Sequence, residues 1–311
     1  MPPAPHTTPP HVDEVHAQLS AWFDGAERDL PWRRPGTTPW GVLVSEVMSQ
    51  QTPVARVAPR WERWMTMWPT PAHMAAASRD VVLTEWGTLG YPRRALRLHE
   101  CARVITERHH GEVPATEEEL RALPGIGSYT AAAIVAFAFH RRAVVLDTNV
   151  RRVIARVFAG VALPPPSPRR HEWELADALA PLADQDAARW AVASMEFGSL
   201  VCTARTPRCD QCPIAHLCGW REAGYPDDEH APIRRPQRFA GTNRQVRGII
   251  MAHLRAHRCA SRDEVAGLWV ADPEQLSACV ESLVADGLVE ETAGVFHLPD
   301  VVVATGGVGA R

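Results

Sequence analysis

The sequence predicts an all-α body followed by a small winged-helix-like module. Apolar residues recur at helical spacing in almost every segment before residue 222, whereas the period-two alternation typical of strands first appears after residue 285. Between the two parts, residues 222–243 are rich in proline, glycine and charge, which predicts a linker. At about 150 residues per domain, a chain of 311 residues can form two domains and a smaller third unit.

The helical body is expected over residues 12–221. The Pro-rich residues 1–11 lack the basic start and apolar core of a signal peptide, so we expect a disordered tail there. Residues 129–140 are apolar almost all round, which predicts a helix buried inside the body. No stretch approaches the roughly 18 apolar residues of a membrane span. Helical periodicity, interrupted by proline or glycine, covers residues 12–25, 38–50, 54–67, 71–77, 79–85, 93–108, 117–122, 129–140, 148–158 and 171–199.

The C-terminal module is expected over residues 244–300. Three short helical patterns at 244–256, 261–269 and 273–286 precede two alternating runs around a turn, the order of a winged helix-turn-helix. The third helix of such modules often binds DNA, but here it carries four acidic residues and no arginine. A packing or protein-contact role is therefore at least as well supported. Residues 301–311 form a second tail.

The charge composition restricts the chemistry. The net charge of −3 does not by itself indicate a nucleic-acid binder. All 33 basic residues are arginine, so no lysine amine is available for Schiff-base chemistry. Seven arginines are candidates for a basic strip that faces DNA: Arg93, Arg94, Arg97, Arg103, Arg151, Arg152 and Arg156.

Seven cysteines are an odd number, which makes a disulfide framework a poor explanation. Four of them are separated by six, two and five residues, and four thiolates can hold zinc or a [4Fe-4S] cluster. The spacing favours the cluster, which could brace a loop that presents arginines to phosphate. The four candidate ligands are Cys202, Cys209, Cys212 and Cys218; we expect Cys101, Cys259 and Cys279 to be core residues.

A glycine-rich turn lies in the segment LPGIGSYTA, residues 123–131. Gly125 and Gly127 join a short helix to the buried one, and a tight turn there would point backbone N–H groups outward at a helix N-terminus. Such a turn can bind a DNA phosphate, as in a helix-hairpin-helix, although a simple inter-helix turn would look similar.

Two carboxylates stand in unusual surroundings. Glu46 lies within the apolar run WGVLVSEVM, where desolvation would raise its pKa and suit it to general-acid catalysis near neutral pH. The alternative is an ordinary solvated helix glutamate. Asp147 follows the buried helix and precedes another, so it could be simply an N-cap.

Taken together, LPWRR, VSEVMSQQTPV, WGTLGYPRRALRLH, LPGIGSYTAAAI, LDTNVRRVIAR and MEFGSLVC with its cysteine run resemble the adenine DNA glycosylase (MutY) branch of the endonuclease III superfamily. The resemblance covers roughly residues 29–220. It implies a six-helix barrel with a helix-hairpin-helix over 29–142, and a domain holding a [4Fe-4S] cluster over 12–28 and 143–221.

The resemblance also implies a function. It indicates a monofunctional glycosylase of base excision repair that removes adenine mispaired with 8-oxoguanine or guanine in double-stranded DNA. Such a protein would be a cytoplasmic, nucleoid-associated bacterial monomer. Glu46 would protonate adenine at N7, and Asp147 would stabilise the oxocarbenium-like sugar. Tyr129 and Asn149 would line the same pocket, and Tyr129 stands where strand-cleaving relatives carry a lysine.

The remaining site residues are also implied by the resemblance. The adenine must leave the duplex to be cleaved. Gln51 and Tyr91 would wedge into the vacated stack, and Thr52 and Leu89 would face the opposite guanine. The adenine pocket would be walled by Trp32 and Arg33.

Three departures from the family pattern are visible. Thr148 replaces a usual glycine, and Val192 replaces a Gln or Glu that reads adenine. Only about 68 residues follow the linker, too few for the usual Nudix-like domain that reads 8-oxoguanine, so discrimination of 8-oxoguanine should be weaker. The alternatives are a thymine or uracil mismatch glycosylase on the same scaffold and a non-enzymatic iron–sulfur DNA-binding protein. Glu46 argues against both, because neither needs an acid for N7.

Overall fold

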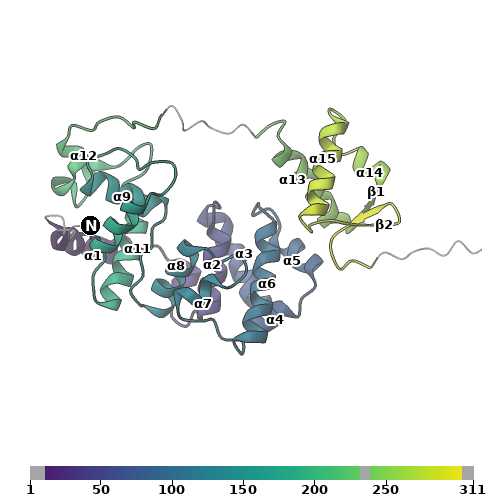
Figure 1. Ribbon diagram of the computed structural model, residues 1–311, viewed down its shortest axis with the longest axis horizontal. Helices are drawn as coiled ribbons and strands as arrows, with labels where there is room; N and C mark the ends of the chain where they lie inside the picture. The colour runs from purple at the N-terminus through teal and green to yellow at the C-terminus, as the bar shows by residue number, and fades with distance from the viewer. Residues whose placement is uncertain (1–10, 232–238, 303–311) are drawn as a thin grey trace, which may run out of the picture. The chain divides into compact units, whose positions relative to one another are not determined.

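The computed structural model is mostly helical, as predicted, and it describes residues 11–231 and 239–302 (Figure 1). Most of the two expected tails, and part of the expected linker, lie outside the described residues. The chain forms two compact units. The first comprises Met1–Leu43, Ala115–Ala122 and Ile126–Pro236; the second comprises Val44–Pro114, Leu123–Gly125 and Gln237–Arg311.

The first unit packs its helices around a core of Leu19, Val153 and Phe197. Helix α8 is buried along most of its length, which confirms the predicted interior helix. The elements of this unit are α1 (Val12–Ala26), η1 (Pro31–Arg33), the start of α2 (Pro39–Ser49), α7 (Glu117–Arg121), α8 (Ser128–Phe139), α9 (Thr148–Phe158), α10 (Arg170–Leu179), α11 (Asp184–Leu200), η2 (Cys209–Gln211), η3 (Ala215–Leu217) and α12 (Gly219–Glu222).

One predicted helix is in fact two. We expected a continuous pattern over 171–199, but the chain leaves the helical conformation between α10 and α11. Ala180 has extended backbone angles (φ −73°, ψ 130°) and precedes Pro181. The proline ring disfavours the helical conformation of the residue before it, which explains the break.

The second unit combines the rest of α2 with α3 (Val54–Met67), α4 (Pro71–Ala75), α5 (Arg79–Trp86) and α6 (Arg93–Arg108). Trp64 is fully buried and makes edge-on contacts with Trp68 and Trp86 at centroid distances of 4.8 and 5.5 Å. Aromatic pairs in this arrangement add to the stability gained from burial alone. The contact with Trp86 holds α3 against α5, and the contact with Trp68 fixes the chain directly after α3.

The C-terminal module belongs to the second unit and is a winged helix, as predicted. Its sheet has the order β1-β3-β2, with antiparallel pairing throughout. The three-residue strand β1 was not predicted. The second helix is shorter than the predicted 261–269, since it ends just before Gly267. Because Ala260 points inward in β1, Cys259 is exposed and is not the core residue we expected. The elements are α13 (Asn243–His257), β1 (Cys259–Ser261), α14 (Arg262–Ala266), α15 (Pro273–Ala285), β2 (Glu290–Thr292) and β3 (Val295–His297).

Ion pairs link the winged helix to α5 and α6 within the second unit. Arg258, which has a left-handed backbone (φ 67°), pairs with the buried Asp80. Arg79 Nη2 lies 2.6 Å from Asp300 Oδ1, and Arg93 Nη1 lies 3.2 Å from Asp286 Oδ1. Arg93 therefore already has an acidic partner. Within the described residues, no helix is long and apolar enough to cross a membrane.

Candidate active site and cysteine cluster

Asp147 forms the N-cap of α9. Its Oδ1 accepts hydrogen bonds from the backbone N–H groups of Asn149 and Val150 at 2.8 and 2.6 Å. Its Oδ2 accepts a third bond from the Asn149 side-chain amide at 2.8 Å. The two interpretations of Asp147 are thus compatible, because the capping bonds also fix the orientation of the carboxylate.

The electrostatics of Asp147 combine opposing effects. Burial raises the pKa of Asp147, while the hydrogen bonds from Val150 and Asn149 and the charge of Arg152 lower it, and burial prevails. A carboxylate in such a site interacts strongly with any positive charge that develops nearby, because little solvent screens it. The arrangement suits electrostatic stabilisation of a cation.

A chain of hydrogen bonds runs from Asp147 to the cysteine segment. Asn149 Oδ1 accepts a bond from Arg152 Nη2 at 2.8 Å. Arg152 also donates from Nη2 to the Gly198 carbonyl at 2.6 Å and from Nε to the Cys202 carbonyl at 2.7 Å. One guanidinium therefore connects the carboxylate segment to the first cysteine.

The prediction of a DNA-facing strip is wrong for three of its arginines. Arg151, Arg152 and Arg156 are only 6%, 7% and 2% exposed. Arg151 pairs with Glu172 at 2.8 Å, and the other two donate to backbone carbonyls. Helix periodicity cannot distinguish such buried arginines from solvent-facing ones, because a guanidinium can also satisfy carbonyls inside a protein.

Gly198 determines how closely α11 approaches α9. A Cβ atom at Gly198 would lie 2.8 Å from the Cβ of Asn149 and 2.9 Å from its carbonyl oxygen. Only glycine fits this contact. We did not predict the role of Gly198, and we assigned Arg152 to the DNA-facing strip instead of to this interior contact. A glycine inside an apolar helix was the available signal for a close backbone approach.

Tyr129 is half-buried near the N-terminus of α8, in the same unit as Asp147. Its hydroxyl lies 3.8 Å from the Met195 sulfur. Tyr129 stands at the position where we expect a lysine in strand-cleaving relatives. In this chain its phenol hydroxyl faces the thioether sulfur of Met195.

Glu46 lies on α2 and is 8% exposed. Its neighbours along the helix, Val44, Val47 and Met48, are also buried. Glu46 is therefore a sheltered carboxyl group rather than the solvated helix glutamate of the alternative interpretation.

The turn with Trp32 and Arg33 is held by a buried glutamate. Glu196, 1% exposed, accepts bonds from Arg28 Nε at 2.6 Å and from Arg33 Nη2 at 3.0 Å. Burial opposes ionisation, but the bonds and charges of both arginines keep the pKa of Glu196 below its usual value. Arg33 Nη1 is buried without a hydrogen-bond partner among the described residues.

Two loops of the second unit, one between α2 and α3 and the other between α5 and α6, contact each other. They carry four residues that we predicted to contact DNA. Gln51 and Tyr91 have left-handed backbones (φ 53° and 49°), and both side chains are exposed. Thr52 and Leu89 are buried, and the Thr52 hydroxyl donates to the Leu89 carbonyl at 3.1 Å. The loops are thus joined to each other while they present Gln51 and Tyr91 to solvent.

The predicted glycine turn connects α7 to α8. Gly125 has a positive φ of 80°, and a Cβ there would lie 2.9 Å from the Cβ of Arg97. Gly127 is the exposed N-cap of α8, with no heavy atom close to its missing Cβ. The turn therefore requires glycine at 125 and leaves open space at 127, as a backbone-mediated contact would need.

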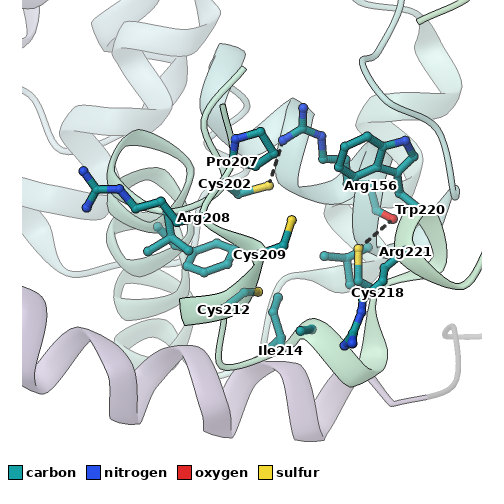
Figure 2. Close-up of a pocket in the computed structure, with 14 residues that line it drawn as sticks. Arg156, Cys202, Pro207, Arg208, Cys209, Cys212, Ile214, Cys218, Trp220 and Arg221 are labelled. Carbon is teal, nitrogen blue, oxygen red and sulfur yellow. Dashed lines mark hydrogen bonds between the residues drawn. The ribbon is translucent and has the colours of Figure 1, made fainter. Parts of the chain in front are cut away.

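The four predicted ligand cysteines line one pocket (Figure 2). The rest of the lining combines apolar side chains, among them Phe197 and Ile214, with Arg156, Arg208 and Arg221. Arg156 Nη1 lies 3.3 Å from the Cys202 sulfur, and the Cys218 sulfur lies 3.6 Å from the Arg156 carbonyl oxygen. The Arg156 guanidinium also stacks over Trp220, 4.4 Å from its ring centroid.

Burial affects the thiols of this pocket. It raises the pKa of Cys212 to about 12 and also raises that of Cys218. The neutral thiol is therefore favoured, and thiolates in this pocket require a cationic partner, which a bound metal or cluster would supply.

Comparisons with known proteins agree with this geometry. The chain matches the family model of the HhH-GPD superfamily base excision DNA repair protein over residues 44–177. It matches the iron-sulfur binding domain of endonuclease III over residues 202–218. A solved structure described as a thermostable thymine-DNA glycosylase superposes with a TM-score of 0.62 at 26% identity, over 68% of this chain and 97% of that one.

Curated relatives extend the similarity to nearly the whole chain. The adenine DNA glycosylase of Mycobacterium tuberculosis (strain H37Rv) is 50% identical over 303 residues, which cover 96% of this chain and 97% of the relative. The human adenine DNA glycosylase is 41% identical over 68% of this chain and 40% of its own length. The chain thus carries an iron–sulfur binding domain and belongs to the adenine DNA glycosylase family of HhH-GPD base excision repair proteins.

Proposed function

We propose that this protein removes adenine mispaired with 8-oxoguanine or guanine by hydrolysing its N-glycosidic bond. The observation that carries the proposal is the Asp147 carboxylate, which three N–H donors hold in a buried site. This geometry occurs in a chain that is 50% identical to an adenine DNA glycosylase over nearly its whole length. The substrate class and the residue roles follow the resemblance to relatives, and the bonds to Asp147 support its role.

The chemistry uses the two carboxyl groups differently. An adenine anion is a poor leaving group, so the base must be protonated before it departs. Glu46, sheltered on α2, donates a proton to N7. As the bond to the sugar stretches, positive charge develops at the anomeric carbon, and the oriented Asp147 carboxylate stabilises it.

The other site residues bind and position the DNA. The adenine is extruded from the duplex into a pocket formed with Trp32, Arg33, Tyr129 and Asn149. Gln51 and Tyr91 enter the vacated stack.

Further contacts secure the rest of the duplex. Thr52 and Leu89 meet the opposite guanine through the junction of the two loops. The turn at Gly125 and Gly127 binds a backbone phosphate at the N-terminus of α8.

The reaction ends at an abasic site. No lysine exists in the chain to form a Schiff base, so water, not a side-chain amine, completes the substitution at the sugar. Borohydride treatment of the protein with cleaved duplex should therefore trap no covalent adduct. Efficient trapping would contradict the monofunctional mechanism.

The cofactor of the proposed enzyme is a [4Fe-4S] cluster held by the four cysteines. Its role is structural: when bound, it fixes the 202–218 loop. The chain's own contacts complete the support, because Arg152 and Arg156 tie that loop to α9. We propose a monomer that acts on chromosomal DNA in the bacterial cytoplasm.

The function is tested with a panel of duplexes. The holoprotein is incubated with A·8-oxoG, A·G, A·C and G·T duplexes, and alkali then reveals abasic sites. We expect cleavage at adenine opposite 8-oxoguanine and guanine and none at thymine. Cleavage at G·T alone would favour a thymine glycosylase. A relative named thymine/uracil-DNA glycosylase, from Pyrobaculum aerophilum, is 33% identical over 63% of this chain.

A further inference from the structure

We propose that Arg94 is a positioning residue that locks together the two loops expected to enter the DNA stack. The first wedge loop is defined as residues 50–53, between α2 and α3, and the second wedge loop as residues 87–92, between α5 and α6. The inference rests on the proposed function, in which Gln51 and Tyr91 wedge into the duplex. It adds a residue that would touch neither base nor phosphate.

Arg94 first binds the end of α2 and the first wedge loop. Its Nη1 donates to the carbonyls of Val47, Met48 and Gln50 at 2.8, 3.2 and 2.6 Å. The last carbonyls of a helix have no partner within the helix, and a cation there also complements the helix dipole. The guanidinium thus fixes where α2 stops and the loop begins.

The other side of the guanidinium binds both wedge loops. Arg94 Nη2 donates to the Thr52 hydroxyl at 3.0 Å and to the Gly90 carbonyl at 3.1 Å. The guanidinium carbon also lies 5.1 Å from the Trp86 ring centroid and 5.5 Å from that of Tyr91. One side chain therefore contacts both loops and one of the expected wedges.

These contacts flank the two strained residues. Gln50 and Thr52, which bind the guanidinium, are the neighbours of Gln51, and Gly90 precedes Tyr91. Non-glycine residues keep a left-handed backbone only where the surrounding structure imposes it. Arg94 supplies that constraint for both wedges from a single point.

Only arginine has the geometry for this role. A guanidinium offers five donors in a planar fork, whereas a lysine ammonium is a point charge on a flexible stem. A lysine could satisfy one loop but could not bridge the two. We expected Arg94 to face DNA; its guanidinium instead binds the backbone of its own chain.

Arg94 should affect base extrusion rather than bond cleavage. Pushing side chains into a base stack requires unstacking, and preorganised wedges lower that barrier. Without Arg94 the loops can relax, so extrusion slows. The rate of excision of an adenine that is already unstacked should fall much less.

The test compares Arg94→Ala, Arg94→Lys and the wild-type holoprotein, with Arg108→Ala as the matched control. Arg108 is the last residue of the same helix, is exposed, and belongs to neither wedge loop. Single-turnover excision is measured on an A·8-oxoG duplex and on a substrate whose adenine faces a gap and stacks poorly. A fluorescent 2-aminopurine beside the adenine reports extrusion.

We expect both Arg94 variants to slow extrusion and excision in the duplex by about 10²-fold, the size of effect produced by misplacement of about 1 Å. Excision from the gapped substrate should fall much less, and ethylguanidinium ion should partly restore Arg94→Ala. Arg108→Ala should match the wild type. Equal losses on both substrates, or wild-type extrusion in both variants, would overturn the proposal.

The outcomes separate this inference from the proposed function. If the wild type excises no adenine, the proposed function fails. If Gln51→Ala and Tyr91→Ala leave extrusion unchanged, the proposed wedge roles of these two residues fail. Either result removes the basis of the Arg94 proposal. If Arg94→Ala does not fold, Arg94→Lys carries the same prediction, since it keeps the charge. Cluster absorption and thermal melting verify that each variant is intact.

Discussion

A single methyl group at Gly198 should disturb the active site from α11. In Gly198→Ala the new Cβ would lie 2.8 Å from the Cβ of Asn149, closer than such atoms approach. Neither neighbour can yield freely, because one contact is with backbone of α9 and Asn149 itself is held by Arg152. The helices must separate or Asn149 must move.

The magnitude follows from these contacts. Overpacking of this kind costs about 1–3 kcal/mol of folding free energy. Displacement of Asn149 also weakens its bond to the Asp147 carboxylate, and a hydrogen bond to a charged group contributes about 1.5–3 kcal/mol. If that bond is lost in the transition state, excision slows by roughly 10- to 100-fold. Duplex binding should change little, because Gly198 lies in the protein interior.

Thermal melting and single-turnover excision on one duplex measure the two effects. Gly248→Ala is the matched control, since Gly248 is also inside a helix but has open space at its Cβ. That change should stabilise the protein by about 0.5–1 kcal/mol and leave excision unchanged. Wild-type stability and rate in Gly198→Ala would refute the close contact between α11 and α9.

Three further predictions concern acid stability, salt dependence and the winged helix. The pKa of Glu196 is lowered in the folded state, so its ionisation stabilises the fold above the unfolded-state pKa, and this contribution disappears as pH falls through the folded-state pKa. Urea unfolding should show Glu196→Gln less stable than the wild type at neutral pH, with the gap closing in acid; a constant gap would contradict this. If about six phosphates are neutralised, log K should fall with log salt with a slope of about −5, and a slope near zero would refute phosphate contact. Arg258→Ala removes the partner of the buried Asp80 and should lower the melting temperature of the full chain; unchanged melting would show that the pair contributes nothing.

Local sequence signals predicted much of the fold because they act over a few residues. The bounds of α3 and α6 agree with the predicted 54–67 and 93–108, since proline, glycine and apolar periodicity define both ends. The N-cap role of Asp147 is confirmed for the same reason. The winged helix was recognisable from three helices and a hairpin.

Features that depend on distant segments were not predictable. The strand β1 has three residues and exists because β3, far along the chain, pairs with it. The arginines of α9 look like a basic surface, but Arg152 and Arg156 donate to carbonyls brought close by folding, and Arg151 pairs with Glu172. Gly198 is meaningful only once α9 is packed against α11.

The central claim concerns a proton delivered to N7 of adenine by Glu46. The most direct measurement is single-turnover excision of 7-deazaadenine opposite 8-oxoguanine, because this base has a carbon where adenine accepts the proton. We expect tight binding of the modified duplex with no detectable excision by the wild-type holoprotein, while the ordinary adenine duplex is cleaved. Excision of 7-deazaadenine at a rate comparable to that of adenine would contradict proton transfer to N7.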